Sequence, residues 1–275
     1  MSAARASGWR EPVLWIALCA ALSPSLVDLG GHWAARPWAL ASAIFAPLWL
    51  LATLRDRSPR RPHADGYLLL ALGLVVALGC AGGGMARLGR PGIPLAILGL
   101  SRVLGRPTPA RALIAAWMVP VPDALVNALS PGLESAIAAA AVALARGFGV
   151  DASFTDGQLA GPAGALVLGA ADGGLPLAAL LGGLGWYRAA SSGASIGAAA
   201  VAALRIAPWA LPVQIVALCL ACGLALAGAS GLAADLLHYG VWMAAMAAAW
   251  IGGRRRSARP ERMRLGSGAR WRRAR

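Results

Sequence analysis

Long apolar runs fill most of this chain and decide what it can fold into. Eight windows are almost free of charge, namely residues 12–30, 37–54, 67–83, 92–105, 111–129, 163–186, 193–227 and 232–251. Inside lipid every backbone N–H and C=O group must be satisfied within the segment, so runs of this length are expected to be membrane-crossing helices. The fourth window is short, and Pro208 and Pro212 interrupt the seventh.

Composition points the same way, because 59% of the 275 residues are hydrophobic and only 13% are charged. A soluble domain of this length needs more polar surface than that. We therefore expect an all-α fold, a polytopic integral membrane helical bundle of about eight transmembrane helices. The bundle is predicted over residues 1–251, and residues 252–275 are predicted to form a basic, disordered tail.

The net charge of +14 is unevenly distributed. Ten arginines follow Ile251, and others cluster in residues 55–66 and 106–111. Positive charge accumulates on the cytoplasmic side of membrane proteins, so these segments and both termini are predicted to be cytoplasmic, in a protein of the cell (inner) membrane. The tail is expected to contact anionic lipid headgroups. No aromatic interleaving accompanies the arginines, so nucleic acid is not an expected partner.

Residues 130–162 break the apolar pattern. Ser130 or Pro131 is predicted to begin a helix there, and Gly147 to end it. The polar connection that follows is expected outside the cytoplasm, and its Thr-Asp-Gly run at 155–157 predicts a small turn or hairpin.

An ionisable group at membrane depth costs about 2.5–3.5 kcal/mol, so each one is a candidate functional residue. The candidates are Asp28, Asp123, Asp172, Arg205, Asp235 and His238. The three aspartates other than Asp172 lie near window ends and are expected to be solvated or to cap helices. Arg205 is expected to extend to the cytoplasmic interface. Asp172 lies deeper. It is either the N-cap of a helix that begins at Gly173, or a functional residue, or both.

Other kinds of site are not favoured. Cys19, Cys80, Cys219 and Cys222 all lie in apolar runs without histidines at ligand spacing, so they are expected to be buried hydrophobic residues. No metal and no cofactor is predicted. An aspartyl intramembrane protease needs two carboxylates that share a proton. The Gly-x-Gly-Asp pattern of one such group is absent, since Gly169, Ala170 and Ala171 precede the aspartate.

One block of the chain is similar to a known family. The run MVPVPDALVNALSPGLESAIAAAAVALARGFGVDASFTDGQLAGPAGALVLGAADGGL resembles the central block of the exosortase/archaeosortase family. Pro120, Pro122, Gly149, Val150 and Gly157 stand where the family pattern has them. The resemblance covers about residues 115–250 and continues through PWALPVQIVALC and LLHYGVWMAAM.

The resemblance implies a membrane transpeptidase that cuts proteins at a C-terminal sorting signal with a cysteine, an arginine and a histidine near the outer face. Here the cysteine position falls on Asp172, and the serine after it falls on Gly173. The family's Asn-x-x-Arg pattern falls on Gln214 and Ala217, while the histidine is kept as His238. The implied site is therefore degenerate. Asp172 and His238 stand at the catalytic positions, and the binding positions are Gln214, Gly173 and Gly174.

Three hypotheses of function follow. The first is an exosortase/archaeosortase-like multi-pass membrane protein of protein sorting or cell-envelope processing, lacking cysteine transpeptidase activity; it either binds sorting-signal helices of secreted proteins or has altered chemistry. The second is a small membrane transporter or channel component, with a polar path lined by Asp172, Gln214 and His238. The third is a non-catalytic accessory subunit that packs through small-residue runs such as Gly182-Gly183 and Ala198–Ala200.

Overall fold

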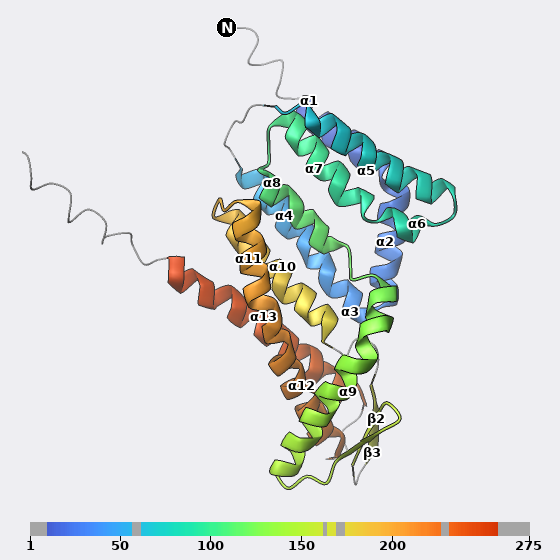
Figure 1. Ribbon diagram of the computed structural model, residues 1–275, viewed down its shortest axis with the longest axis vertical. Helices are drawn as coiled ribbons and strands as arrows, with labels where there is room; N and C mark the ends of the chain where they lie inside the picture. Colours follow the sequence, from blue (N-terminus) through green and yellow to red (C-terminus); the bar gives the residue numbers. More distant parts are fainter. Residues whose placement is uncertain (1–9, 57–61, 162–163, 169–173, 227–230, 258–275) are drawn as a thin grey trace, which may run out of the picture.

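The computed structural model describes residues 10–56, 62–161, 164–168, 174–226 and 231–257 (Figure 1). Helices dominate it, and the α-helices are α1 (Arg10–Ala21), α2 (Ser23–Ala35), α3 (Pro37–Leu40), α4 (Phe45–Arg55), α5 (Asp65–Gly82), α6 (Ala86–Gly89), α7 (Gly92–Leu104), α8 (Pro109–Ala112), α9 (Asp123–Gly147), α10 (Leu175–Ser191), α11 (Ile196–Ile206), α12 (Ala210–Leu226) and α13 (Gly231–Ser257). The 3-10 turns are η1 (Ala41–Ile44), η2 (Leu113–Met118) and η4 (Ala207–Trp209). The strands are β1 (Ser153–Thr155), β2 (Gln158–Gly161) and β3 (Gly164–Val167).

Among the described residues, four helical stretches are long and apolar enough to cross a membrane, namely Trp38–Arg55, Asp65–Gly82, Asp123–Gly147 and Ile196–Leu220. The pair α1–α2, bent by 66°, adds a fifth if it counts as one broken span. The protein is thus a predominantly helical chain whose apolar helices indicate a membrane-embedded bundle, and the expected eight spans are not confirmed.

Two of the expected spans are too short or broken. Helix α7 has 13 residues and is about 20 Å long, less than the roughly 30 Å of a hydrocarbon core. The window 111–129 is divided, because extended backbone that contains Pro120 and Pro122 separates η2 from α9. Helix α9 begins at Asp123, an acidic residue that suits a positive helix N-terminus, so the start predicted at Ser130 or Pro131 is wrong. Its predicted end at Gly147 is confirmed.

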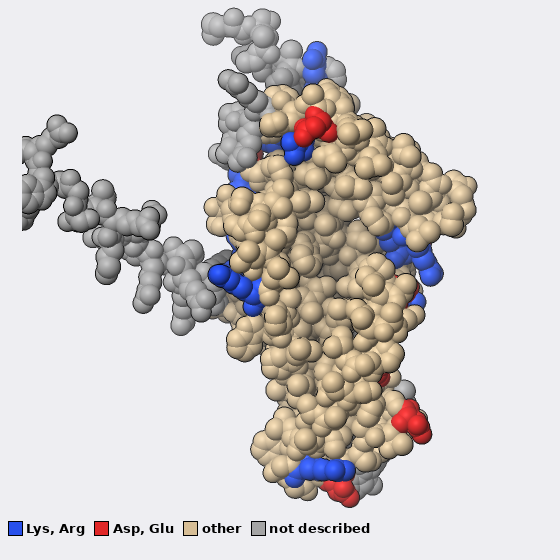
Figure 2. All heavy atoms as spheres, in the orientation of Figure 1, with Lys and Arg blue, Asp and Glu red and all other residues tan. Residues whose placement is uncertain are grey.

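Helix α5 carries its large side chains on the outside. Leu68 and Val75 are 73% and 69% exposed, whereas Gly66, Gly73 and Ala77 are buried. A soluble protein would reverse this arrangement, but lipid is as apolar as leucine and places no such demand on the surface. The face visible in Figure 2 agrees, because charged side chains occupy only a few small groups and leave broad uncharged areas.

The buried face of α5 brings its backbone against α7. A Cβ added to Gly73 would overlap the backbone nitrogen of Ala96, and one added to Gly99 would overlap the backbone of Leu70. Small residues let two helix backbones approach this closely, which is how membrane helices gain packing energy. The pair therefore depends on glycine at these positions.

Helix α10 lies in the middle of the bundle and uses glycines in the same way (Figure 1). Trp117 and Phe45 pack directly over Gly182 and Gly183, and a Cβ on Gly185 would lie 2.7 Å from the carbonyl oxygen of Ala202. The Gly182-Gly183 run, which the accessory-subunit hypothesis assigned to a partner, is therefore occupied by side chains of the chain itself.

The predicted hairpin at 155–157 is confirmed. Strands β1 and β2 pair antiparallel with Thr155 opposite Gln158, and β3 adds a third antiparallel strand. Asp156 and Gly157 have φ of 53° and 73°, the left-handed pair that a two-residue hairpin turn requires. The sheet packs on α9 and α12 through Leu159 and neighbouring apolar residues. This small sheet is the one departure from an all-α fold among the described residues.

The opposite end of the bundle is joined by a buried ion pair. Asp56, 4% exposed, lies 3.0 Å from Arg111 and accepts a hydrogen bond from the backbone N–H of Thr108. Arg111 also donates to the carbonyl oxygens of Ala190 and Ser191 at the end of α10. One arginine thus links the ends of α4, α8 and α10.

The contrast between two glycines of α5 provides a test. Gly73→Ala should destabilise the protein by about 1–3 kcal/mol. Its new methyl group would overlap backbone atoms of α7, which cannot move aside as a side chain can. Gly79→Ala on the same helix meets nothing within 4 Å and should be neutral or slightly stabilising. Thermal unfolding of both variants in detergent micelles measures the difference; equal melting temperatures would contradict the close α5–α7 contact.

Candidate functional site

The positions that the resemblance assigns to the site lie on or beside α10, α12 and α13. Asp172 and Gly173 lie outside the described residues. His238 belongs to α13, but its side chain is outside the description, as is that of Asp235. Gly174 and Gln214 are fully described.

Gly174 stands directly before α10 in the left-handed region, with φ 74°, and occupies its N-cap position. The helix start predicted at Gly173 is therefore wrong, because α10 starts at Leu175. The side chain of Asp172, expected as its cap, lies outside the described residues. Glycine adopts this left-handed backbone conformation without strain because it has no Cβ, which allows the chain to turn sharply into α10. A Cβ on Gly174 would lie 3.6 Å from the Cβ of Gln214 and 3.5 Å from Cδ1 of Ile137. The start of α10 thus rests against α9 and α12.

Gln214 is completely buried in α12, and its Oε1 accepts a hydrogen bond of 2.9 Å from Nε1 of Trp242 in α13. Trp242 is 2% exposed and meets Tyr239 edge-on, with ring centroids 5.7 Å apart. A buried amide without partners is costly, so this bond fixes α12 against α13. The structure brings together Gly174, Gln214 and Trp242. In α13, Trp242 lies one helical turn after His238.

Sequence reasoning missed Trp242, because it treats this residue as an interfacial aromatic residue, although Trp242 lies in the middle of the window 232–251. A signal was present. The indole N–H can only donate, and Gln214 is an amide in an otherwise apolar helix that needs donors. Trp186 also departs from the interfacial pattern, since it is 9% exposed and donates to the carbonyl oxygen of Ala110.

The position where the resemblance expects arginine, Ala217, is fully buried. Within the described residues no group of His, Cys, Asp or Glu side chains has the arrangement of a metal site. Among the described cysteines, Cys19 is exposed and Cys80 and Cys219 are half-buried. The expectation of buried thiols is wrong for these three, because apolar helices here turn much of their surface outward.

The other ionisable candidates form pairs or sit at helix ends. Asp28 accepts a hydrogen bond from Arg90 at 2.8 Å, and Asp123 pairs with Arg36 at 2.5 Å. Both aspartates are therefore held in ion pairs, and Asp123 also stands at the N-terminus of α9, at a helix end as expected. Arg205 is exposed in the last turn of α11, before the break that Pro208 introduces.

Comparison of the chain with models of known protein families, with curated proteins and with solved structures finds no match. The site is therefore defined by its own geometry.

Trp242→Phe tests the central bond of this site. Phenylalanine keeps the ring but removes the indole N–H, which leaves Oε1 of Gln214 without that donor in a dry interior. The expected cost is about 1–3 kcal/mol of unfolding free energy. Trp209→Phe, at a position that is 66% exposed, should change stability little. Thermal unfolding compares them, and equal effects would show that the bond does not hold α12 to α13.

Proposed function

We propose that this protein is an exosortase/archaeosortase-like membrane protein that binds C-terminal sorting-signal helices of secreted proteins without cleaving them. The observation that carries the proposal is the meeting of Gly174, Gln214 and Trp242. These residues stand on or next to the three helices, α10, α12 and α13, to which the resemblance assigns the nucleophile, the Asn-x-x-Arg pattern and the histidine.

Chemistry supports the non-catalytic form of this proposal. A thiolate attacks an amide readily, and a neighbouring cation stabilises the thiolate or the oxyanion. Asp172 stands in place of that thiol, and Ala217 stands in place of the cation. A single carboxylate without an acid partner does not cleave an amide at neutral pH.

A transporter or channel is less well supported. Its polar path would need Gln214 to face water, but this amide is completely buried and bonded to Trp242.

The proposal includes an orientation. Arg111 binds the last carbonyl oxygens of α10 and pairs with Asp56, which also accepts a hydrogen bond from the backbone of Thr108. Arg55 and Arg106 are within two residues of Asp56 and Thr108, so these arginines lie at the end of the bundle where α10 terminates. The hairpin β1–β2 lies at the far end of the long axis (Figure 1). We assign the arginine-rich end to the cytoplasm and the hairpin to the outside, following the distribution of positive charge.

Binding is tested with a fluorescent peptide that carries a C-terminal sorting-signal helix, added to the full-length protein in lipid nanodiscs. We expect saturable binding with no cleavage. A scrambled peptide of the same composition should bind about tenfold more weakly, a difference of roughly 1.4 kcal/mol. Gln214→Leu should weaken binding of the signal peptide, because it removes the hydrogen bond that fixes α12 against α13. Ser101→Ala, a buried change in α7, serves as the matched control.

Equal binding of the two peptides would contradict recognition of sorting signals. Cleavage by the unmodified protein that Asp172→Ala abolishes would contradict the non-catalytic assignment and establish carboxylate chemistry. Asp172→Cys, alone and with Ala217→Arg, rebuilds the family residues. Cleavage gained only in these variants would support the degenerate site.

Orientation is tested with two cysteines introduced into a background free of native cysteine. Ser153 in β1 and Ser192 after α10 are both exposed. In intact cells an impermeant maleimide should label Ser153→Cys, while Ser192→Cys should react only after the membrane is opened. The reverse pattern would invert the topology.

A further inference from the structure

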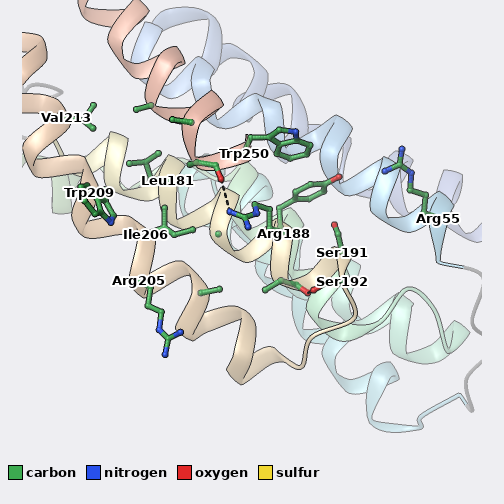
Figure 3. Close-up of a pocket in the computed structure, with 17 residues that line it drawn as sticks. Arg55, Leu181, Arg188, Ser191, Ser192, Arg205, Ile206, Trp209, Val213 and Trp250 are labelled. Atoms are coloured by element: carbon green, nitrogen blue, oxygen red, sulfur yellow. Dashed lines mark hydrogen bonds between the residues drawn. The ribbon is translucent and has the colours of Figure 1, made fainter. Parts of the chain in front are cut away.

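A groove of about 930 Å³ lies between α10, α11 and α13, and neither Gly174 nor Gln214 lines it. Figure 3 shows the residues around it. Its volume is within the range of about 300–1,000 Å³ that is common for small-molecule sites. The groove has an apolar part and a polar part.

The apolar part is built from Leu181, Ile206, Trp209 and Val213, which lie together on one side of the groove in Figure 3. On the α13 side the groove is lined by small residues, Ala245 and Ala248, which leave room for a ligand. A slot with small residues on one side and bulky apolar residues on the other accommodates a hydrocarbon chain.

The polar part lies towards the end of α10, where Arg188, Ser191 and Ser192 face the groove and Arg55 stands beyond them (Figure 3). The guanidinium of Arg188 donates to the carbonyl oxygen of Ala249 at 2.7 Å, which fixes its position against α13. The buried hydroxyl of Ser191 has no hydrogen-bond partner among the described residues.

Charge in the groove has one sign. Arg55, Arg188 and Arg205 line it, and no acidic residue does within the part of the chain that the structure describes, although in Figure 3 Arg205 extends away from the other two. Arg55 and Arg205 have no ion-pair partner in the described part of the chain. Guanidinium groups match phosphate geometry, and basic pockets between membrane helices on the cytoplasmic side bind anionic lipid headgroups.

We infer that this groove is a binding site for one phospholipid with an anionic headgroup, independent of the proposed function. Its phosphate lies against Arg188 and Arg55, with Ser191 and Ser192 as further donors. An acyl chain follows Leu181, Ile206 and Trp209. Tyr187 and Trp250, stacked with ring centroids 5.4 Å apart, close the wall between α10 and α13.

The test uses the full-length protein, stripped of lipid in detergent and titrated with phosphatidylglycerol or phosphatidylcholine while native mass spectrometry counts retained lipid. One phosphatidylglycerol should be retained in preference to phosphatidylcholine. Arg55→Gln and Arg188→Gln should each weaken retention about fivefold, and Arg188→Lys should restore part of it. Arg10→Gln, an exposed arginine outside the groove, is the charge-matched control and should have no effect.

Ala248→Phe fills the groove from an exposed position and leaves every arginine in place, so it should abolish specific retention. Equal retention of the two lipids would overturn the inference, as would retention that Ala248→Phe leaves unchanged. Inorganic phosphate that binds the unmodified protein, while phosphatidylglycerol is retained no better than phosphatidylcholine, would indicate a phosphate site without a lipid chain, which also overturns it.

Discussion

Close approach of helix backbones at small residues is the constraint on which this bundle depends. Water does not drive apolar helices together inside lipid, so packing contacts and internal hydrogen bonds must hold them. Gly73 and Gly99 let α5 and α7 meet backbone to backbone, and Gly183 admits the ring of Phe45 to the central helix α10. A bulkier residue at any of these positions would separate the elements that it joins.

Buried polar groups also hold specific helices together, and they do so at both ends of α10. At its start, Gly174 lies against Gln214, and the side chain of Gln214 accepts a hydrogen bond from Trp242 of α13. At its end, Arg111 joins Asp56 to the last carbonyl groups of the helix. Each bond satisfies a group that would otherwise be costly in a dry interior. The proposed sorting-signal site and the lipid groove therefore share one rigid central helix.

The helical membrane character and the hairpin at Asp156-Gly157 could be predicted from the sequence, because apolar length and turn chemistry are local properties. The number of spans could not, since Pro120 and Pro122 divide one window and α7 is too short to cross. The partner of Gln214 is 28 residues away along the chain, and local pattern does not identify such a contact. The groove was missed because Arg188 lies in a short connection between two apolar windows, and only the fold places it beside α11 and α13.

Accessibility of spin labels along α5 tests the central claim most directly, namely that large side chains face lipid while small ones face the protein. Labels at Leu72 and Val75 should relax strongly with oxygen, which partitions into the membrane, and weakly with a water-soluble nickel complex. A label at Ala77, which is fully buried, should respond little to either agent. Strong relaxation of the Leu72 and Val75 labels by the water-soluble agent would contradict the account, because it would place this face of α5 in water.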